Sequence, residues 1–515
     1  MRPKIILPVS WLLCNAGLTF AQPGTLDPAF SANGKVITNI GVAPDQDIEA
    51  IALQSDGKIV AVGNLYDFNR FNYNEIAIVR YNSHGRLDKS FGDEGIIIPT
   101  LPSDDNVVWD VKIQADGKIL LAGTSYAGPK SDFLLLRYNN DGTPDKSFGN
   151  NGIVRTDFEN SYDFVYTMAI QKDGKIVVAG GGKNGKNCAL ARYNKNGTLD
   201  PAFGDNGKVT TVVNGNVGAF AISVAILPDG KIIIADRITS NTGSYDFALV
   251  RYKPNGAVDK TFGTLGRVFT DIADSDDFPS SMAVQSDGKI LVCGTIRPDE
   301  TRFQIALVRY NKNGTLDKTF NGNGKVITNT DKTADDEASA VALQPDGKII
   351  VAGRNSHSDF VVIRFTTDGS KDKSFGNNGL AKAHFIYSSY ATSIALQKDG
   401  KIVAGGYVFE DFSEFALARF NGDNVSETLS TQSDITINTN SQIKIYPNPV
   451  GDYIHVTGLD ITAPATISII DNTGKALQKI SNANNTVTVK MLPPGIYYLL
   501  IDQKGKRSSL KFEKQ

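Results

Sequence analysis

Three pairs of neighbouring aspartates have the residue type that could bind a metal ion. The pairs are Asp104–Asp105, Asp276–Asp277 and Asp335–Asp336. Carboxylate oxygens are the ligands that calcium prefers, but a dedicated calcium loop spaces them at alternating positions, and none of the three pairs does so. The histidines and cysteines are scattered without the short spacing of zinc ligands. The sequence therefore favours solvated acidic loops, and we predict no metal site and no cofactor.

Nucleophilic catalysis has one candidate in the sequence. His357 lies in the segment NSHSD, beside Ser356, Ser358 and Asp359. Catalytic triads are assembled from distant segments rather than from sequence neighbours, so we predict no catalytic residue. A catalytic pair of carboxylates that cleaves a polysaccharide remains an open alternative, because the separation between two such groups is set by the fold and not by their spacing in the sequence.

The elements that would position these side chains are repeated along the chain. Asp-Gly-Lys occurs seven times, starting at Asp56, Asp116, Asp173, Asp229, Asp287, Asp346 and Asp399. Asp-Gly between two apolar runs is typical of a β-hairpin, and the expected connection is a two-residue type I′ turn with positive φ at both residues. A period of about 57 residues with four short strands per copy predicts a seven-bladed β-propeller.

An arginine recurs in the third strand of each copy, and in six copies an aspartate follows eight residues later. These pairs are Arg80–Asp88, Arg137–Asp145, Arg192–Asp200, Arg251–Asp259, Arg309–Asp317 and Arg364–Asp372. Arg419 in the seventh copy lacks this aspartate, whereas Asp27 near the N-terminus lacks the arginine. We predict that Arg419 pairs with Asp27 and that residues 34–38 form the outer strand of the last blade, which closes the ring. Because the seven pairs repeat and an active site is built once, we expect them to be structural.

The copies, such as QSDGKIVAVG followed by IAIVRYNSHGRLDKSFG, resemble the delta-60 repeat, a bacterial propeller-type repeat of unknown molecular function. The resemblance runs from Gly24 to about Gly422 and implies a propeller domain, which we place at residues 22–424. Cys188 and Cys293 lie in different copies, so we expect buried free thiols rather than a disulfide. Trp109 is expected to pack between blades.

Both ends of the chain have features of an exported protein. Arg2 and Lys4 precede an apolar run that ends in TFA, which predicts a secretory signal peptide over residues 1–21. We expect no transmembrane segment after it, because no other apolar run is long enough to span a membrane. The balance of 53 basic and 55 acidic residues argues against a nucleic-acid partner.

The C-terminal part differs from the repeats. A polar stretch predicts a linker over residues 425–442, and alternating strands predict a small immunoglobulin-like β-sandwich over residues 443–515. This region resembles the C-terminal sorting domain of the type IX secretion system. The matching motif residues are Tyr446, Pro447, Asn448, Pro449, Gly495 and Tyr497. The resemblance implies that residues 443–515 interact with the type IX secretion machinery. It also implies that the protein is secreted or lies on the outer-membrane surface of a Gram-negative bacterium.

The loops of the predicted propeller form a constant set and a variable set. The Asp-Gly hairpins and the NKNGTLDKTFG-like connections barely change and share one face, whereas the remaining loops vary and share the other face. Variable loops on a rigid scaffold tend to hold binding residues, so we predict a non-catalytic binding protein for an extracellular glycan or protein. The candidate ligand-binding residues are Tyr66, Phe68, Phe71, Tyr73, Tyr126, Arg297, Tyr407 and Phe409. The alternatives are a polysaccharide-acting enzyme with one carboxylate site at the channel mouth, and a purely structural or adhesive surface component.

Overall fold

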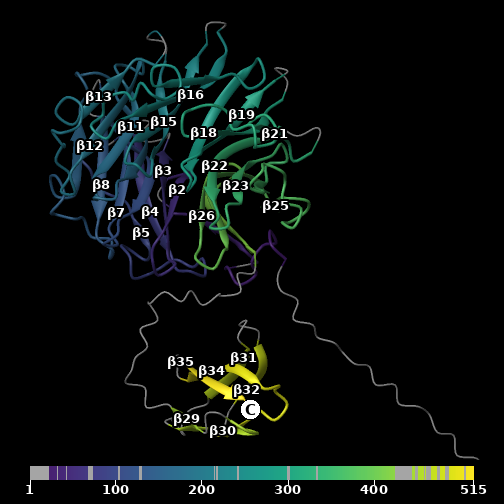
Figure 1. The fold of residues 1–515 in the computed structure, drawn as a ribbon. Coiled ribbons are helices and arrows are strands. Elements are labelled where there is room, and N and C mark those ends of the chain that lie inside the picture. The colour runs from purple at the N-terminus through teal and green to yellow at the C-terminus, as the bar shows by residue number, and fades with distance from the viewer. Residues whose placement is uncertain are drawn as a thin grey trace, which may run out of the picture. The chain divides into compact units, whose positions relative to one another are not determined.

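The computed structural model describes residues 22–514, apart from 32, 42, 68–72, 103–104, 127–129, 214, 216–217, 241–242, 299–301, 332–334, 424–443, 447–449, 458, 460–464, 472–475, 482–485 and 504–505. Over the described residues the protein is all-β, as predicted (Figure 1). None of these residues belongs to a helix with the length and apolarity needed to cross a membrane. The chain divides into two compact units, residues 1–424 and residues 425–515.

Seven four-stranded antiparallel sheets form the first unit, and each sheet is one blade. Blades 1 and 2 contain β2 (Asp45–Leu53), β3 (Ile59–Asp67), β4 (Tyr73–Tyr81) and β5 (Ile96–Ile97), then β6 (Asp105–Ile113), β7 (Ile119–Tyr126), β8 (Ser131–Tyr138) and β9 (Ile153–Thr156). Blades 3 and 4 contain β10 (Phe164–Ile170), β11 (Ile176–Gly182), β12 (Asn187–Tyr193) and β13 (Lys208–Thr211), then β14 (Phe220–Ile226), β15 (Ile232–Thr239), β16 (Tyr245–Tyr252) and β17 (Arg267–Thr270). Blades 5 and 6 contain β18 (Asp276–Val284), β19 (Ile290–Arg297), β20 (Gln304–Tyr310) and β21 (Lys325–Thr328), then β22 (Glu337–Leu343), β23 (Ile349–Arg354), β24 (Phe360–Phe365) and β25 (Leu380–Ala383). Blade 7 contains β26 (Ser388–Leu396), β27 (Ile402–Phe409), β28 (Ser413–Phe420) and the N-terminal strand β1 (Lys35–Thr38).

The blades form a closed ring. The first strand of each blade lies innermost and contacts the first strands of its two neighbours, and β26 of blade 7 contacts β2 of blade 1 (Figure 1). Strand β1 pairs with β28, with Lys35 opposite Ala418 and Thr38 opposite Phe415. The predicted closure by an N-terminal strand is therefore confirmed. With β1 added, blade 7 has four strands like the other blades, and its exposed edge is a short strand of four residues, which limits unwanted edge pairing.

The apolar core lies between blades. Each core cluster combines the middle strands of two neighbouring blades, as in the cluster that joins Leu120 of β7 to Val178 of β11. This arrangement explains why the middle strands read as continuous apolar runs, since both of their faces are buried. Cys188 and Cys293 are buried free thiols in these clusters, as predicted.

The Asp-Gly hairpins differ from the predicted turn. Gly57 has a φ of +85°, but Asp56 does not have a positive φ. The Gly57 N–H donates to the Gln54 carbonyl (2.9 Å) and the Gln54 N–H donates to the Lys58 carbonyl (2.9 Å), so the loop has three residues and ends in a glycine bulge. The prediction of a two-residue type I′ turn is wrong. Instead of adopting positive φ, the aspartate accepts a hydrogen bond from the amide two residues later, and this bond recurs in all seven hairpins.

The repeated arginines reach from one blade to the next. Arg80 Nε donates to Asp88 Oδ2 (2.9 Å), its guanidinium lies 4.3 Å from the centroid of the buried Phe91 ring, and Nη1 donates to the carbonyl of Asn140 in blade 2. The same aspartate contact occurs in the other copies, with distances of 2.7 to 2.9 Å. Each arginine thus contacts a carboxylate, an aromatic ring and, in six of the seven copies, a carbonyl of the next blade.

The pair Arg419–Asp27 joins the two ends of the propeller. Arg419 Nε donates to Asp27 Oδ2 (2.9 Å), and Nη1 donates to the Ser83 carbonyl in blade 1. Both side chains of the pair are buried. Arg364 differs from the other six repeated arginines, because its Nη2 donates to the Asp423 carboxylate (2.7 Å) and not to a carbonyl of the next blade.

The second unit contains two antiparallel sheets. One sheet consists of β29 (Lys444–Tyr446), β30 (Tyr453–Thr457) and β33 (Thr486–Thr488), and the other of β32 (Ala476–Ser481), β31 (Ala465–Asp471), β34 (Gly495–Gln503) and β35 (Lys506–Lys514). A common core joins them, with Ile454 and Val487 from the first sheet and Ile467, Leu499 and Phe512 from the second. The unit is thus a two-sheet structure, and its immunoglobulin-like topology stays a prediction.

Candidate ligand site at the axis of the propeller

Each innermost strand has one β-bulge at the same position of the repeat. The bulged residues are Glu49, Trp109, Tyr166, Ile222, Ser280, Ser339 and Thr392. Each of them is half-buried, whereas the residue before it is buried in every blade. We call these residues and the residues two positions before them the axial positions. They share a place in the fold but not their chemistry, so the inner wall of the ring is asymmetric although the scaffold is repeated.

The close approach of the two strands beside the bulge explains a glycine in six of the seven blades. A Cβ atom on Gly63 would lie 1.9 Å from the Asp47 carbonyl oxygen, and a Cβ atom on Gly180 would lie 1.8 Å from that of Phe164. Six KIVVAG-like runs end in glycine at this position, and the run of blade 4 ends in Asp236. The bulge is therefore built into the repeat, and in each blade it re-aims one side chain of the innermost strand.

Blade 1 contributes two carboxyl groups to the axial positions. Asp47 and Glu49 lie two residues apart on β2, and both side chains are half-buried. Burial and the charge of Asp47 raise the pKa of Glu49 to about 8, although Asn64 Nδ2 donates a hydrogen bond to its Oε1 (3.2 Å). Burial also raises the pKa of Asp47, and its Oδ1 is buried without a hydrogen-bond partner. At neutral pH Glu49 therefore holds a proton beside a second acidic group.

Tyrosines of blades 1 and 7 lie next to these carboxyl groups. Burial, with the charges of Glu49 and Asp47, raises the pKa of the Tyr66 hydroxyl, and the same two charges act on Tyr407. The Tyr407 ring stacks on Tyr390 with a centroid distance of 4.9 Å and an interplanar angle of 12°. This part of the wall thus combines flat aromatic surface with hydroxyl and carboxyl groups.

An arginine of blade 6 extends this group of side chains. The Arg354 guanidinium lies 4.3 Å from the centroid of Tyr390 and forms an ion pair with Glu337 of the neighbouring strand. The ion pair fixes the guanidinium over the ring, where cation–π attraction adds to the contact.

Blades 2 to 5 contribute an aromatic wall. The ring of Trp109 lies 5.8 Å from Tyr166, which lies 6.1 Å from Phe220 in an edge-to-face contact. Farther round, Tyr245 lies 5.5 Å from Phe278, and the Arg237 guanidinium lies 4.6 Å from Tyr245. The innermost strands therefore contribute acidic and hydroxyl groups on one side of the ring and tilted or edge-to-face aromatic pairs on the other.

Family models match most of the repeats and the tail. The domain of unknown function DUF5122, described as a beta-propeller, matches residues 54–91, 114–148, 171–203, 227–262, 285–320, 344–375 and 397–423. Residues 444–515 match the secretion system C-terminal sorting domain. The chain is a DUF5122 β-propeller protein with a C-terminal sorting domain. This confirms the two resemblances, and the sorting domain marks the protein for export to the cell surface or for secretion by the type IX system.

Solved structures similar to the DUF5122 protein are distant. PorZ, a surface component of the type IX secretion system of Porphyromonas gingivalis, is 13% identical with a TM-score of 0.42, over 93% of this chain and 61% of that chain. A PL25 ulvan lyase is 12% identical with a TM-score of 0.41, over 79% and 95% of the two chains. A protein of unknown function from Dyadobacter fermentans is 11% identical with a TM-score of 0.38, over 77% and 100%. No curated protein matches. The DUF5122 protein thus spans about three fifths of PorZ, and none of these likenesses carries an argument about its activity.

The predicted ligand-binding residues fall in several places of the DUF5122 propeller. Tyr66 and Tyr407 lie together beside Asp47 and Glu49, and Tyr126 contacts the ring of Phe164 at 6.4 Å. The exposed residues Arg297 and Phe409 lie at the ends of their strands, Arg297 with its guanidinium 5.6 Å from the Phe303 ring. Phe68, Phe71 and the side chain of Tyr73 lie outside the described residues.

The structure corrects the expectation of solvated loops at two aspartates and shows the contacts of two other residues that the sequence singled out. Asp277 and Asp336 do not lie in solvated loops, because both are fully buried and accept hydrogen bonds from the amides of Ile272 and Thr330. Asp359 contacts Nδ1 of His384 (2.9 Å), a residue 25 positions away, rather than joining its neighbour His357. Trp109 contacts the next blade, as expected, but it does so from an axial position.

Sequence reasoning missed Asp47, Glu49, Tyr390 and Arg354. They lie within strands, where the residue pattern indicates core packing and does not mark ligand-binding positions. The available signal was the residue just before each AIALQ-like run, which changes from Glu49 to Trp109 to Tyr166 while its surroundings repeat.

In the sorting domain, the Tyr446 ring is exposed and lies 5.3 Å from His455. Tyr497, two residues after Gly495, donates from its hydroxyl to the Pro493 carbonyl (2.8 Å) and stacks on Phe512. Pro447, Asn448 and Pro449 lie outside the described residues.

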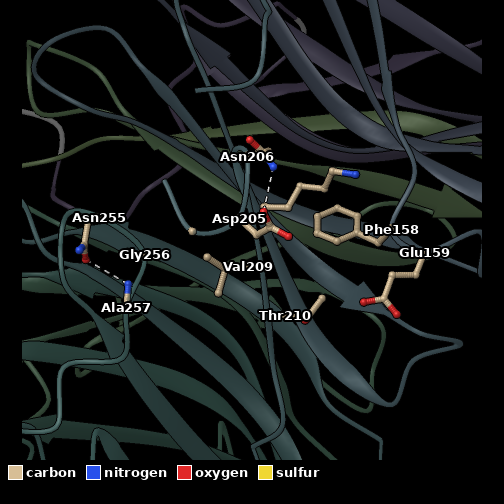
Figure 2. Close-up of a pocket in the computed structure, with 11 residues that line it drawn as sticks. Phe158, Glu159, Asp205, Asn206, Val209, Thr210, Asn255, Gly256 and Ala257 are labelled. Carbon is tan, nitrogen blue, oxygen red and sulfur yellow. Dashed lines mark hydrogen bonds between the residues drawn. The ribbon is translucent and has the colours of Figure 1, made fainter. Parts of the chain in front are cut away.

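A hollow at the outer rim of blades 3 and 4 is made from the repeated connections (Figure 2). Asn206 donates to Asp205 (2.9 Å) and the Ala257 amide donates to Asn255 (3.2 Å) within those turns. The lining side chains are thus used in the scaffold, and we place the candidate site at the axis and not at this rim.

Replacing Glu49 with Gln is expected to raise the melting temperature of the protein at pH 9 and to leave it nearly unchanged at pH 5. A carboxyl group whose pKa is raised by folding stabilises the folded state at low pH, and this contribution is lost as the pH rises toward the folded pKa of about 8. Gln resembles the protonated form and has no such loss. Thermal melts across this pH range measure the effect, and an equal shift at both pH values would contradict the raised pKa.

Proposed function

We propose that this exported propeller is a non-catalytic binding protein that holds a carbohydrate at the axial positions. The observation that carries the proposal is the asymmetric wall: carboxyl groups and tyrosines in blades 1 and 7, and tilted or edge-to-face aromatic pairs in blades 2 to 5. Seven equivalent bulged positions with six different types of side chain are suited to one ligand in one orientation.

The chemistry of these side chains fits a sugar better than a purely apolar ligand. Aromatic rings offer large flat apolar surfaces, on which the C–H face of a sugar ring packs, and they lose little conformational entropy on binding. The half-buried Asp47 carboxylate and Tyr66 hydroxyl offer an acceptor and a donor at the edge of that surface, as sugar hydroxyl groups require. Export by the sorting domain would bring the site into contact with extracellular glycans.

A screen of the purified full chain against glycans and soluble polysaccharides tests the proposal. We expect retention of at least one polysaccharide class without new reducing or unsaturated ends in the same wells. A chain that binds no glycan in the screen but captures a protein ligand at the axial residues would contradict the sugar assignment.

A second candidate function is cleavage of a polysaccharide at the same positions. It is favoured by the protonated Glu49 beside Asp47, because general acid catalysis needs a carboxyl group that keeps its proton near pH 7. Product formation that is lost in Glu49→Gln would support this function over binding alone.

A further inference from the structure

Three aspartates from separate segments meet at the junction of blades 4 and 5. Asp246 lies on β16, Asp271 directly follows β17, and Asp277 lies on β18 of the next blade. One carboxylate oxygen from each lies within 4.8 Å of the other two. Three negative charges so close together destabilise the fold unless a cation or a proton compensates them.

Two of these carboxylates have oxygens that the protein leaves without a partner. Asp277 is fully buried, and while its Oδ2 accepts a hydrogen bond from the Ile272 amide (2.6 Å), its Oδ1 is buried without a hydrogen bond. Asp246 is only 9% exposed and its Oδ1 is likewise buried and unpartnered. A buried carboxylate oxygen without a donor is costly, so these oxygens point to a ligand that the protein itself does not supply.

The junction of blades 2 and 3 offers an internal comparison. Asp132, Asp157 and Asp163 occupy the same positions and are equally close together. There Asp163 accepts hydrogen bonds from the Phe158 amide (2.6 Å) and the Ser161 hydroxyl (2.8 Å). In the blade 4 and 5 cluster the amide bond has its counterpart, but the hydroxyl of Ser275, at the position of Ser161, makes no hydrogen bond.

The charges around the two clusters also differ. Arg155 and Lys130 partly offset the burial and repulsion that raise the pKa of Asp132, whereas no cation acts in this way on Asp246. Near the blade 4 and 5 cluster, the Lys325 ammonium weakly offsets the charge of Asp277 but donates to the backbone carbonyl of Asp271 (2.7 Å). Among the described residues, no ion pair joins any of the three carboxylates there to a Lys or Arg side chain.

At the junction of blades 7 and 1, the corresponding positions hold one carboxylate and two amides. Asn39 Nδ2 donates to Glu414 (2.7 Å), and Gln46 accepts a hydrogen bond from the Ile40 amide (2.7 Å). The fold therefore does not need three acids at this place, and the cluster of blades 4 and 5 requires its own explanation.

We propose that Asp246, Asp271 and Asp277 bind one divalent cation with the ligand preference of calcium, which joins blade 4 to blade 5. Oxygens that bind calcium at 2.3–2.6 Å can lie up to about 5 Å apart across the ion, which accommodates the spacing of the three carboxylates. Asp271 is exposed, so water can complete the coordination and the ion can enter from solvent. The proposal does not depend on the carbohydrate site.

Calorimetric titration of the EDTA-treated full chain with CaCl2, and separately with MgCl2, tests this inference. We expect one calcium ion per chain, a rise in melting temperature on calcium addition, and an affinity at least tenfold lower in Asp271→Asn. Asp271 is the exposed member of the cluster, so this variant is expected to fold. Asp132→Asn is the matched control and should retain the calcium affinity of the unmodified protein.

The sign of the stability change separates a cation from a proton at this cluster. Burial and the charges of Asp271 and Asp246 raise the pKa of Asp277 to about 7, so a proton is the other way to relieve the repulsion. If calcium binds, Asp246→Asn raises the melting temperature in EDTA and lowers it in calcium, relative to the unmodified protein. A rise in both buffers, no calcium binding at all, or a calcium affinity that is the same in Asp271→Asn would overturn the proposal.

Discussion

Arg419→Met is expected to lower the free energy of unfolding of the propeller by up to about 3–5 kcal/mol, because it removes the guanidinium that pairs with the buried Asp27 carboxylate. The Lys401 ammonium, 3.4 Å from Asp27 Oδ2, then compensates the buried charge only in part. Arg419 and Asp27 are 3% and 4% exposed, and their contact joins the last blade to the N-terminal segment that completes it. The substitution also removes the hydrogen bond to the Ser83 carbonyl in blade 1. Denaturant titration of the full chain, followed through the propeller transition, measures the loss.

Lys89→Met is the matched control for this prediction. Lys89 pairs with Glu94 in blade 1, but the two side chains are 75% and 64% exposed, and exposed ion pairs contribute little to stability. We expect no measurable change in the unfolding transition. If Arg419→Met costs no more than Lys89→Met, the ring is not held closed by the pair with Asp27.

The double variant Tyr66→Ala/Tyr407→Ala is expected to weaken carbohydrate binding by about 100-fold, because aromatic residues at the centre of a site carry much of the binding free energy. Both rings lie beside the carboxyl groups of blade 1, and Tyr407 also supports Tyr390 by stacking. Affinity electrophoresis in gels that contain the retained polysaccharide measures the change.

Phe269→Ala provides the control for this second prediction. Phe269 is an exposed aromatic residue on the outer strand β17, far from the axis in the order of its sheet. Its removal should leave the mobility in the gel unchanged. Equal losses in both variants, or normal retention by the double variant, would remove the axial positions as the binding site.

The fold could be predicted from the sequence because the same pattern of strands and turns occurs seven times. The number of blades follows from the repeat period and the apolar runs. The closure by β1 follows from Arg419, which lacks an aspartate eight residues later, and Asp27, which lacks a preceding arginine. The turn type was not accessible, because Asp-Gly is compatible with more than one hairpin loop. The hydrogen bond from the Lys58 amide to Asp56 is a local contact that the dipeptide alone does not reveal.

The candidate sites were less predictable for physical reasons. Glu49 and Tyr166 lie in bulges that change the alternation of the innermost strand. The sequence shows that this position varies between copies, but not that the strand bulges there. The cluster of Asp246, Asp271 and Asp277 spans two blades, so its proximity depends on packing and not on spacing. Tyr66 and Tyr407 were predictable, since loop-proximal aromatic residues on the variable face stood out against the constant repeat.

A crystal structure of the full chain with an oligosaccharide from the polysaccharide that it retains would test the central claim most directly. The proposal predicts electron density for a sugar ring at the axis, packed on the aromatic wall, with its hydroxyl groups toward Asp47 and Tyr66. Density at the constant face, at the rim hollow or on the sorting domain, with the axis occupied only by water, would contradict it.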